Sequence, residues 1–416
     1  MILVRNRRLP LSGSNLIFAI LFAGLIWGAC SPKVLRPGGG KDVKKPSKEK
    51  EEERRDIEEE VEATETLNFN NIALLLPFQL DKVIDSMPNR KDVERSSLAL
   101  DFYQGFKLGL DRLTSGGDNF KLNVLDTRDN AGEAQRLAVG QDVKDAQLVV
   151  GPVFPTEINA FSKAANLKGK LQISPLAASD PSQYNIGNLV TVTPPIEVHA
   201  QAIAKYIAAE YSVGEQIIIV DNDDEDSKKF LLPLKNTLNK LNISFKEVKE
   251  IEDFELSLAV STANIVINAS TNQFFVAPLV AELYTQKTEN AYDISLVGHP
   301  NWVRLDLDPN YLSTLNTCIS SSYYVNDNDA EVKSFKKLYG DLFKVIPTDF
   351  AYKGYDAGLF FGRLLAEHPE DYADHLIKEA HDGVSMGFDF NYTPNAGYVN
   401  HHIRLLRFDG ERYRPL

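Results

Sequence analysis

The sequence predicts an α/β fold with two doubly wound lobes, each built on a parallel sheet that helices cover. Short apolar runs alternate with segments of helical periodicity from residue 71 to residue 195, and the same alternation starts again after residue 195. A strand followed by a helix, repeated, is typical of a parallel sheet with helices on both faces. Two successive series therefore indicate two sheets, and 416 residues are enough for two or three domains of about 150 residues each.

The first series opens with a buried strand and a long amphipathic helix. The run NIALLLPF, residues 71–78, is apolar almost throughout, as in a strand that is buried on both faces. Residues 97–113 place five large apolar side chains on one helical stripe: Leu98, Phe102, Phe106, Leu110 and Leu113. The pattern continues with strands at 121–127, 147–153 and 171–176 and with helices at 131–146 and 157–169.

The second series follows the segment NLVTVTPP, residues 188–195. It predicts helices at 199–211, 230–241 and 274–286 and strands at 216–222, 263–270 and 293–300. Two later stretches, 329–343 and 355–368, also have helical periodicity. The end of the chain, 387–410, is β-like, with turn signals at Pro394–Asn395 and Asp409–Gly410.

The N-terminus has the features of an export signal. Three arginines precede an apolar core, residues 16–27, which is shorter than the roughly 20 residues that a bilayer span needs. Gly28 and Ala29 stand directly before Cys30, an arrangement that resembles a bacterial lipobox. The resemblance implies that residues 1–30 are a lipoprotein signal peptide and that Cys30 is acylated, anchoring the protein in the membrane. Trp27 departs from the usual Leu, and an ordinary signal peptide or short anchor is the alternative.

Ser31 is not the Asp that is associated with inner-membrane retention, so the resemblance implies an anchor in the outer membrane that faces the periplasm. Residues 31–66 contain almost no large apolar side chains and many charges of both signs. Such a segment cannot bury enough surface to offset the entropy that folding costs. We therefore expect a charged, flexible tether between the anchor and a folded part that starts near Leu67.

The bulk composition limits the partners. A net charge of −13 argues against nucleic acid and anionic membrane surfaces as partners. If Cys30 is acylated, Cys318 has no partner for an intrachain disulfide and is expected to pack as a small apolar residue. Apart from the signal, no segment is long and apolar enough to span a membrane.

The order of the motifs in residues 68–416 resembles one family. VVGPVFP, followed by a helix and then by LQISPLAAS, is similar to the first lobe of type I periplasmic binding proteins, the leucine-binding-protein-like fold. DFYQGFKLGLDRL resembles the family's first helix, and VLDTRDNAGEAQRLA its second strand with the acidic turn that follows. The segment EVKSFKKLYGDLFKVIPTDFAYKGYDAGLFFGRLL is the closest match and includes Tyr355, Asp356 and Ala357.

The resemblance implies two lobes that face a cleft and are joined by several crossings. We expect the first lobe in residues 68–194 plus 327–382 and the second in 195–326 plus 383–416. The crossings are then expected near Pro194–Pro195, near Tyr323–Asn326 and near Gly383. In open α/β sheets, ligands bind beyond the carboxyl ends of the strands, and these ends would form the walls of the cleft.

Seven residues are candidates for the edges of that cleft: Thr156, Ser174, Ala177, Ser179, Asp221, Ser270 and Tyr355. The alternative is that they are loop or capping residues. Several positions depart from the family's amino-acid binders, because Pro155 stands beside Thr156 and Ala178 stands near a position where the family has a hydroxyl. The loop DNDDEDSKK takes the place of a frequent aromatic residue, and the first βα loop, Gln79–Ser97, is long and polar.

Other chemistry finds little support. Asp221–Asp226 lacks the glycine and the distal glutamate of an EF-hand loop, so no calcium site is expected. His401 and His402 adjoin in a β-like run, where neighbouring side chains point to opposite faces. No nucleophile elbow, phosphate-binding loop or zinc-protease motif is present. We therefore expect neither a metal, a cofactor nor an enzymatic activity.

Two functions are consistent with these features. The first is an envelope-anchored regulator or scaffold that acts through protein contacts, for which the tether, the altered GPVFPT loop and the long first loop are the arguments. The alternative is a solute-binding protein that captures an amino acid, a peptide or a sugar-like molecule in the cleft, for uptake by an ABC transporter or for sensing. The partner is then an envelope protein in the first case and a small molecule in the second.

Overall fold

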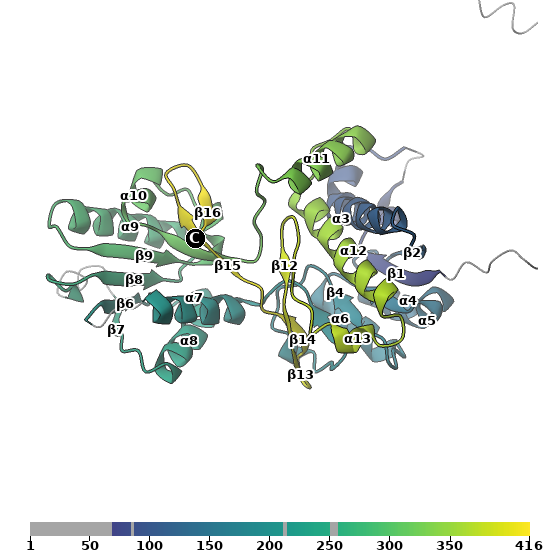
Figure 1. Ribbon diagram of the computed structural model, residues 1–416, viewed down its shortest axis with the longest axis horizontal. Coiled ribbons are helices and arrows are strands. Elements are labelled where there is room, and N and C mark those ends of the chain that lie inside the picture. Colours follow the sequence, from purple (N-terminus) through teal and green to yellow (C-terminus); the bar gives the residue numbers. More distant parts are fainter. Residues whose placement is uncertain (1–68, 85–86, 211–213, 250–256) are drawn as a thin grey trace, which may run out of the picture. The chain divides into compact units, whose positions relative to one another are not determined.

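The computed structural model describes residues 69–84, 87–210, 214–249 and 257–416 (Figure 1). The expected signal peptide with Cys30 and the expected tether, residues 31–66, lie outside the described residues. Two seven-stranded, mostly parallel sheets with flanking helices confirm the predicted fold class. In the part of the chain that is described, no helix combines the length and the apolarity that crossing a membrane requires.

The first sheet has the order β13-β14-β5-β4-β3-β1-β2. Its strands are β1 (Asn70–Leu76), β2 (Phe120–Asp126), β3 (Leu148–Val150), β4 (Gln172–Ser174), β5 (Leu189–Thr191), β13 (Phe390–Thr393) and β14 (Gly397–Asn400). Strands β1 to β5 are parallel, β14 pairs with β5 in parallel, and β13 closes the edge antiparallel to β14. The sheet thus combines five strands from the start of the chain with two from its end.

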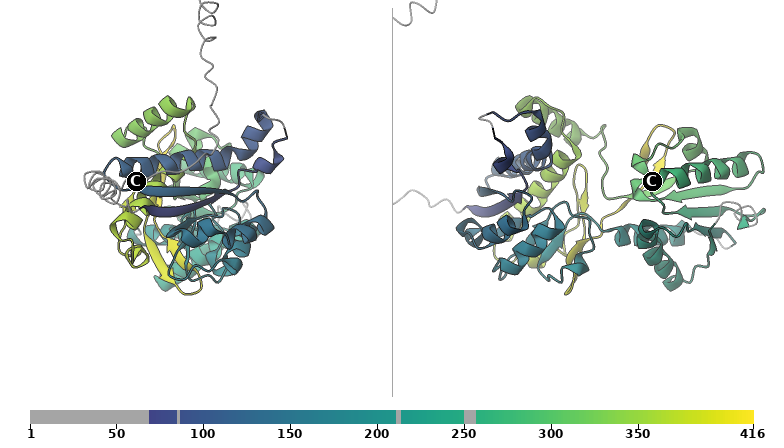
Figure 2. Two further views of the ribbon diagram at one scale, coloured as in Figure 1. Left: turned by 90° about the vertical axis from the view of Figure 1, so that its right-hand side faces the viewer. Right: turned by 180° about the vertical axis from the view of Figure 1, so that it is seen from behind.

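Helices cover both faces of this sheet. They are α3 (Arg90–Thr114), α4 (Ala131–Ala138), α5 (Gln141–Asp145), α6 (Pro155–Ala164), α11 (Ala330–Phe343), α12 (Asp349–Glu367) and α13 (Tyr372–His375). Leu74 of β1 packs in one core cluster with Phe106 of α3 and Phe361 of α12. Leu75, its neighbour, packs on the opposite face with Phe161 of α6. The alternation of side chains along β1 therefore separates two cores, and α3 and α12 run side by side over one of them (Figure 1, Figure 2).

The second sheet has the order β16-β15-β10-β9-β8-β6-β7. Its strands are β6 (Gln216–Val220), β7 (Lys246–Val248), β8 (Asn264–Asn268), β9 (Ile294–Gly298), β10 (Cys318–Ser321), β15 (Arg404–Phe408) and β16 (Tyr413–Pro415). Helices α7 (Ile196–Glu210) and α8 (Glu225–Lys240) share one core with Ile217 and Ile219. The helix α9 (Gln273–Thr288), the 3₁₀ helix η5 (Pro300–Arg304) and α10 (Pro309–Thr314) share the other with Ile218.

The chain passes between the two sheets three times. The first crossing lies between β5 and α7 and contains Pro194 and Pro195, and the second lies between β10 and α11. The third lies at residues 401–403, between β14 and β15, so the expected third crossing near Gly383 is wrong. The expected assignment of 383–416 to the second lobe fails for the same reason, because β13 and β14 pair into the first sheet. This pairing depends on contacts between β14 and β5, which lies about 200 residues earlier. A local sequence pattern cannot predict contacts over such a separation.

Two elements differ from the sequence expectation for local reasons. Helix α3 starts at Arg90, because the side chain of Asn89 caps it by accepting hydrogen bonds from the backbone N–H groups of Lys91 and Asp92. The long first loop therefore ends at residue 89 and contains the 3₁₀ helix η1 (Leu80–Lys82). The helix expected at 131–146 is interrupted at Gly140, the residue that precedes α5.

Candidate functional site

The loops that follow the parallel strands gather at one edge of each sheet. Four of the expected site residues lie at this edge of the first sheet: Ser174 at the end of β4, Ala177 and Ser179 in the loop after it, and Thr156 in the first turn of α6, the helix after β3. In the second sheet this edge carries the loops after β6 and β8, which contain Asp221 and Ser270. Parallel strands bring their carboxyl ends together, and this is where open α/β sheets bind ligands.

The loop after β3 is shaped by close packing. Gly151 has φ 101°, and a Cβ atom there would lie 2.1 Å from the carbonyl oxygen of Leu75, so only glycine fits. Pro155 begins α6, and Thr156 is exposed in the first turn of this helix. The buried Glu157 accepts hydrogen bonds from the backbone N–H groups of Phe154 (3.3 Å) and Asn130 (3.1 Å). The carboxylate of Glu157 thus already accepts a hydrogen bond from a backbone N–H group at the start of α6.

The segment after β4 contains three of the candidates. Ser174 ends the strand, is 2% exposed, and its hydroxyl has no hydrogen-bond partner among the described residues. Ala177 packs against the small core cluster that contains Tyr184. The hydroxyl oxygens of Ser179 and Tyr184 lie 2.6 Å apart and share a hydrogen bond. Ser174 is therefore the candidate in this segment with an unused hydrogen-bonding group.

Asp221, directly after β6, is held in an ion pair. Its carboxylate lies 2.9 Å from Nζ of Lys235, which also lies 2.7 Å from the carboxylate of Glu247. Burial by itself would raise the pKa of Asp221, but the hydrogen bonds from Lys235 and from the backbone N–H of Asp223 outweigh it and the pKa is lowered. Asp221 is thus a charged, partnered side chain, and its carboxylate is not a free ligand for a cation.

Ser270, at the carboxyl end of β8, belongs to a buried polar network. Its hydroxyl donates to the carboxylate of Asp224 (3.0 Å) and accepts from the backbone N–H of Asn272 (3.2 Å). Asp224 also caps α8 by accepting from the backbone N–H of Ser227 (2.6 Å). Asn222 completes the network through its contacts with Asp224 and Ser270. The network positions the loop after β6 against the loop after β8.

Two residues at this edge were missed by the sequence analysis. His299 follows β9, is buried, and its Nδ1 accepts a hydrogen bond from the backbone N–H of Asn301 (3.1 Å). Burial lowers the pKa of His299 to about 4, against the opposing effect of Asp226 and Asp224, so the ring is neutral at pH 7. Trp302 donates from its indole N–H to the carbonyl oxygen of Ser270 (2.8 Å). The signal was present in the motif VGHPNWV, where polar and aromatic residues directly follow a strand.

Tyr355 does not belong to either strand edge. It is buried in α12, where its hydroxyl accepts a hydrogen bond from Arg112 of α3 (2.8 Å) and its ring lies 4.4 Å from that of Phe335 in α11. The next residue, Asp356, accepts hydrogen bonds from the backbone N–H groups of residues 384–386. The structure thus places Tyr355 in a core between three helices, apart from the strand-end candidates.

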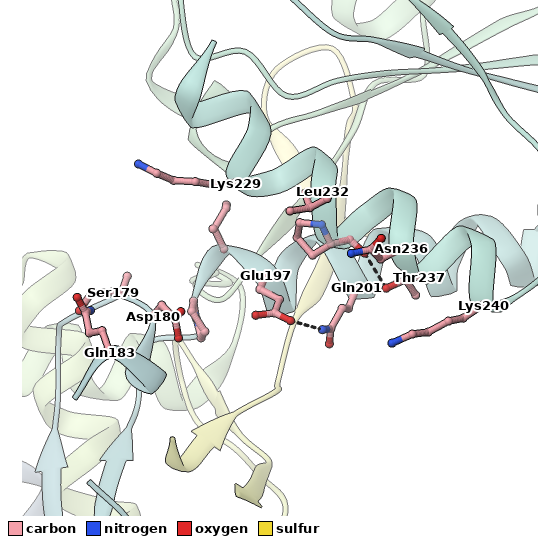
Figure 3. A pocket seen from close by; sticks show the side chains of 14 residues that line it. Ser179, Asp180, Gln183, Glu197, Gln201, Lys229, Leu232, Asn236, Thr237 and Lys240 are labelled. Carbon is pink, nitrogen blue, oxygen red and sulfur yellow. Dashed lines mark hydrogen bonds between the residues drawn. The ribbon is translucent and has the colours of Figure 1, made fainter. Parts of the chain in front are cut away.

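A pocket of about 730 Å³ lies beside the first crossing (Figure 3). One side consists of residues after β4, the second of the start of α7, and the third of α8. Its lining contains two carboxylates, two lysines, several amides and some apolar side chains. The lining residues are Ala178, Ser179, Asp180, Gln183, Pro195, Ile196, Glu197, Gln201, Lys229, Leu232, Pro233, Asn236, Thr237 and Lys240. Among the seven candidate site residues, Ser179 is the one that belongs to this lining.

Several polar groups in this lining retain hydrogen-bonding capacity. Gln201 donates to the carboxylate of Glu197 (3.0 Å), and Thr237 donates to the carbonyl oxygen of Pro233 (2.8 Å) (Figure 3). The Lys229 ammonium is paired with Asp226 on the same helix (2.9 Å). An amide or a carboxylate has more hydrogen-bonding positions than one such contact uses, so the lining can bind a polar molecule. A pocket of 300 to 1,000 Å³ is the usual size for a small-molecule site.

Comparisons with known proteins identify the fold. No protein-family model and no curated protein sequence matches the chain. Among solved structures, a protein from Rhodospirillum rubrum described as a branched-chain amino acid ABC transporter is 16% identical, with a TM-score of 0.60 over 84% of this chain and 100% of that chain. An ABC transporter substrate-binding protein from Desulfitobacterium hafniense, in complex with Leu, gives 16% identity and a TM-score of 0.52 over the same shares.

A third similar structure is an ABC transporter substrate-binding protein from Sphaerobacter thermophilus. It is 16% identical, with a TM-score of 0.51 over 84% of this chain and 96% of that chain. These similarities, together with the two sheets and their three crossings, show that the chain has the type I periplasmic-binding-protein-like fold. The resemblance that the sequence motifs indicated is confirmed at the level of the fold.

Proposed function

We propose that this protein is a non-enzymatic solute-binding protein and that its ligand binds in the pocket beside the first crossing. The observation that carries the proposal is the pocket itself, because it is lined from both sides of the crossing and has the volume of a small-molecule site. A change in the angle at a hinge of this kind would open or close the pocket around a ligand. This favours the solute-capture alternative over the scaffold that we first inferred from the sequence.

The charges of the lining favour a zwitterionic ligand. Asp180 and Glu197 provide two carboxylates, and Lys229 and Lys240 provide two ammonium groups, so the lining holds both signs of charge. Leu232 and Pro233 provide an apolar surface beside them. An amino acid or a short peptide has both charges and an apolar part. The amino acid in the similar structure in complex with Leu belongs to this class.

The test is a thermal-shift screen of the purified full chain against amino acids, short peptides, sugars and muropeptides. A ligand at 100 times its Kd stabilises the protein by about 2.7 kcal/mol. We expect amino acids or peptides to raise the melting temperature, and Leu232→Trp, which places a bulky ring in the lining, to abolish the rise. The matched control is Leu338→Trp, which changes an exposed leucine of α11 outside the pocket and should retain the rise in melting temperature. A screen without any shift, or a shift that Leu232→Trp leaves unchanged, contradicts the proposal.

One observation favours the second function, a regulator or scaffold at the cell envelope. The loop between β1 and α3 exposes three large apolar side chains: Leu80 is 62% exposed, Ile84 95% and Met87 78%. These three side chains fall within eight residues of the sequence, and a large exposed apolar patch is typical of a protein contact. Replacing all three with Ser should abolish capture of a specific envelope partner in a pull-down and leave the thermal-shift response unchanged. Unchanged capture would exclude this loop as the contact.

We also propose that Cys30 carries the lipid that anchors the protein in the bacterial outer membrane, facing the periplasm. The support is the sequence pattern of residues 5–30. Cys30→Ser should remain unprocessed or become detached, so it should leave the detergent phase in a partition experiment. A variant that still matures and fractionates with membranes contradicts the anchor.

A further inference from the structure

Four titratable side chains gather where α12 ends and α13 begins. His368 follows the last residue of α12, His375 ends α13, Asp371 directly precedes α13, and Glu379 follows four residues after His375. His368, Asp371 and His375 each offer a ligand atom within 4.8 Å of the others. This cluster lies in the first lobe and contributes no residue to the proposed solute pocket.

One distance in the cluster matches the spacing between two ligands of a metal ion. Nε2 of His375 lies 3.4 Å from the carboxylate of Asp371. Zinc binds nitrogen and oxygen at about 2.0 to 2.2 Å, so two tetrahedral ligands are about 3.3 Å apart. At 3.4 Å the nitrogen and the oxygen are farther apart than in a good hydrogen bond. Neither imidazole ring makes a hydrogen bond among the described residues, although carboxylates surround both.

The carboxylate of Glu379 lies near one nitrogen of each histidine ring. Its carboxylate lies 3.4 Å from Nε2 of His368 and 3.7 Å from Nδ1 of His375. In metal sites, the nitrogen that does not bind the ion usually donates its proton to a carboxylate. Both distances are longer than a good hydrogen bond, so Glu379 would move closer to the rings when an ion binds. The assignment leaves Nδ1 of His368, Nε2 of His375 and the carboxylate of Asp371 for the ion. Arg363 lies 3.8 Å from Glu379 and balances its charge.

The surroundings hold these side chains in place. Tyr372, within α13, is buried, and its hydroxyl accepts from the backbone N–H of Leu171 (3.0 Å) and donates to the carbonyl oxygen of Gln147 (2.8 Å). Leu376 is fully buried in the core of the first sheet. The two histidine rings are stacked at 3.5 Å with an angle of 11°, and their side chains are 27% and 26% exposed. Because stacked parallel rings cannot both direct a nitrogen lone pair at one ion, one ring must turn about its Cβ–Cγ bond when the ion binds.

We propose that this cluster is a binding site for a divalent transition metal ion, with Zn²⁺ as the ion that suits two imidazoles and a carboxylate. The three ligands leave a fourth position for water. The ion would fix the end of α12 to α13 and so stabilise the turn between them.

The test uses the full chain without a polyhistidine tag, stripped of metal with a chelator. Titration calorimetry with ZnCl₂ should give one ion per chain, and Co²⁺ should give the visible absorption of a tetrahedral site. His375→Gln and Asp371→Asn should each weaken binding at least about tenfold, and Glu379→Gln, which removes the outer carboxylate, about 10- to 100-fold. His401→Gln changes a histidine outside the cluster and is the matched control that should bind as the unaltered protein does.

The outcome does not depend on the variants alone. Zn²⁺ should also raise the melting temperature of the unaltered protein, because an ion that binds only the folded state stabilises it. Circular dichroism should show the same helix content for all variants. Failure of the unaltered chain to bind stoichiometric Zn²⁺, or equal binding by a His368→Gln His375→Gln double variant, overturns the proposal. Neither result affects the solute pocket, whose test involves different residues.

Discussion

Nζ of Lys235 lies 2.9 Å from the carboxylate of Asp221, and both side chains are mostly buried. The pair links the loop after β6 to α8, and it occupies a carboxylate that the sequence alone suggested for a ligand. Lys235→Met leaves Asp221 without its partner and should lower the free energy of unfolding by about 2 kcal/mol at pH 7, the range for a hydrogen bond to a charged group. Urea denaturation measures the difference.

The effect of Lys235→Met should depend on pH in a defined direction. The pKa of Asp221 is lowered in the folded protein, so its ionised form stabilises the fold above the unfolded pKa of about 4, and this contribution is lost as the pH falls through the folded pKa. The difference between the variant and the unaltered protein should therefore shrink on acidification. Lys337→Met breaks an exposed pair with Asp341 and, as the control, should change stability by less than about 0.5 kcal/mol. A constant difference at all pH values would contradict the assigned role of the pair.

Ser174→Ala should stabilise the ligand-free protein. The hydroxyl of Ser174 is buried and has no hydrogen-bond partner among the described residues, and leaving such a group unpaired costs about 1 to 3 kcal/mol. The control, Ser179→Ala, removes a hydroxyl that is bonded to Tyr184 and should destabilise by about 1 kcal/mol. Chemical denaturation compares the two variants, and a loss of stability in Ser174→Ala would show that its hydroxyl has a partner.

Asp356 makes stability depend on pH in the opposite direction to Asp221. Burial raises its pKa to about 6, although the hydroxyl of Ser385 and the backbone N–H groups of residues 384–386 oppose the shift. The folded pKa exceeds the unfolded value of about 4, so the protonated Asp356 stabilises the folded protein fully below pH 4. This stabilisation, about 3 kcal/mol, is lost as the pH rises to about 6. Asp356→Asn cannot titrate. The advantage of the unaltered protein over the variant should therefore fall between pH 4 and pH 6, and a rise in that interval would contradict the assignment.

Gly105→Ala should disrupt the first lobe. A Cβ atom at Gly105 of α3 would lie 1.9 Å from the carbonyl oxygen of Ala351 in α12, so the two helices would have to separate. Overpacking of this kind costs about 1 to 3 kcal/mol or more. Gly340→Ala in α11 is the control, because its nearest contact would be at 3.8 Å and alanine favours the helix by up to about 1 kcal/mol. The melting temperature should fall in the first variant and stay or rise in the second.

The sequence predicted the alternating strands and helices well, because that information is local. The run at 71–78 predicted β1. A short, continuous apolar segment that ends at a proline, within a series of alternating strands and helices, is typical of a strand buried on both faces. The stripe from Leu98 to Leu113 identifies α3 in the same way. The start of α3 was missed by seven residues, because the cap at Asn89 precedes a polar first turn without apolar periodicity.

The candidate site was predicted less completely. Strand ends can be read from the sequence, and Ser174, Asp221 and Ser270 lie at strand ends or in the loops directly after them, whereas their role in binding stays a prediction. Their partners could not be read, since Lys235 lies 14 residues from Asp221 and Asp224 lies 46 residues from Ser270. The pocket combines residues from the segment after β4, from the start of α7 and from α8, and none of these segments contains a motif that distinguishes a lining residue from an ordinary surface residue.

The sequence by itself determined the fold class and the two series of strands and helices, and it predicts an anchor at the N-terminus. Only the tertiary structure decided that β13 and β14 join the first sheet, that Tyr355 belongs to a helix core, and that His368 and His375 stack beside Glu379. The physical reason is the range of the interactions involved. Periodicity, capping and turn chemistry act over a few residues, whereas strand pairing, helix packing and side-chain networks are selected by contacts that form only when distant segments meet.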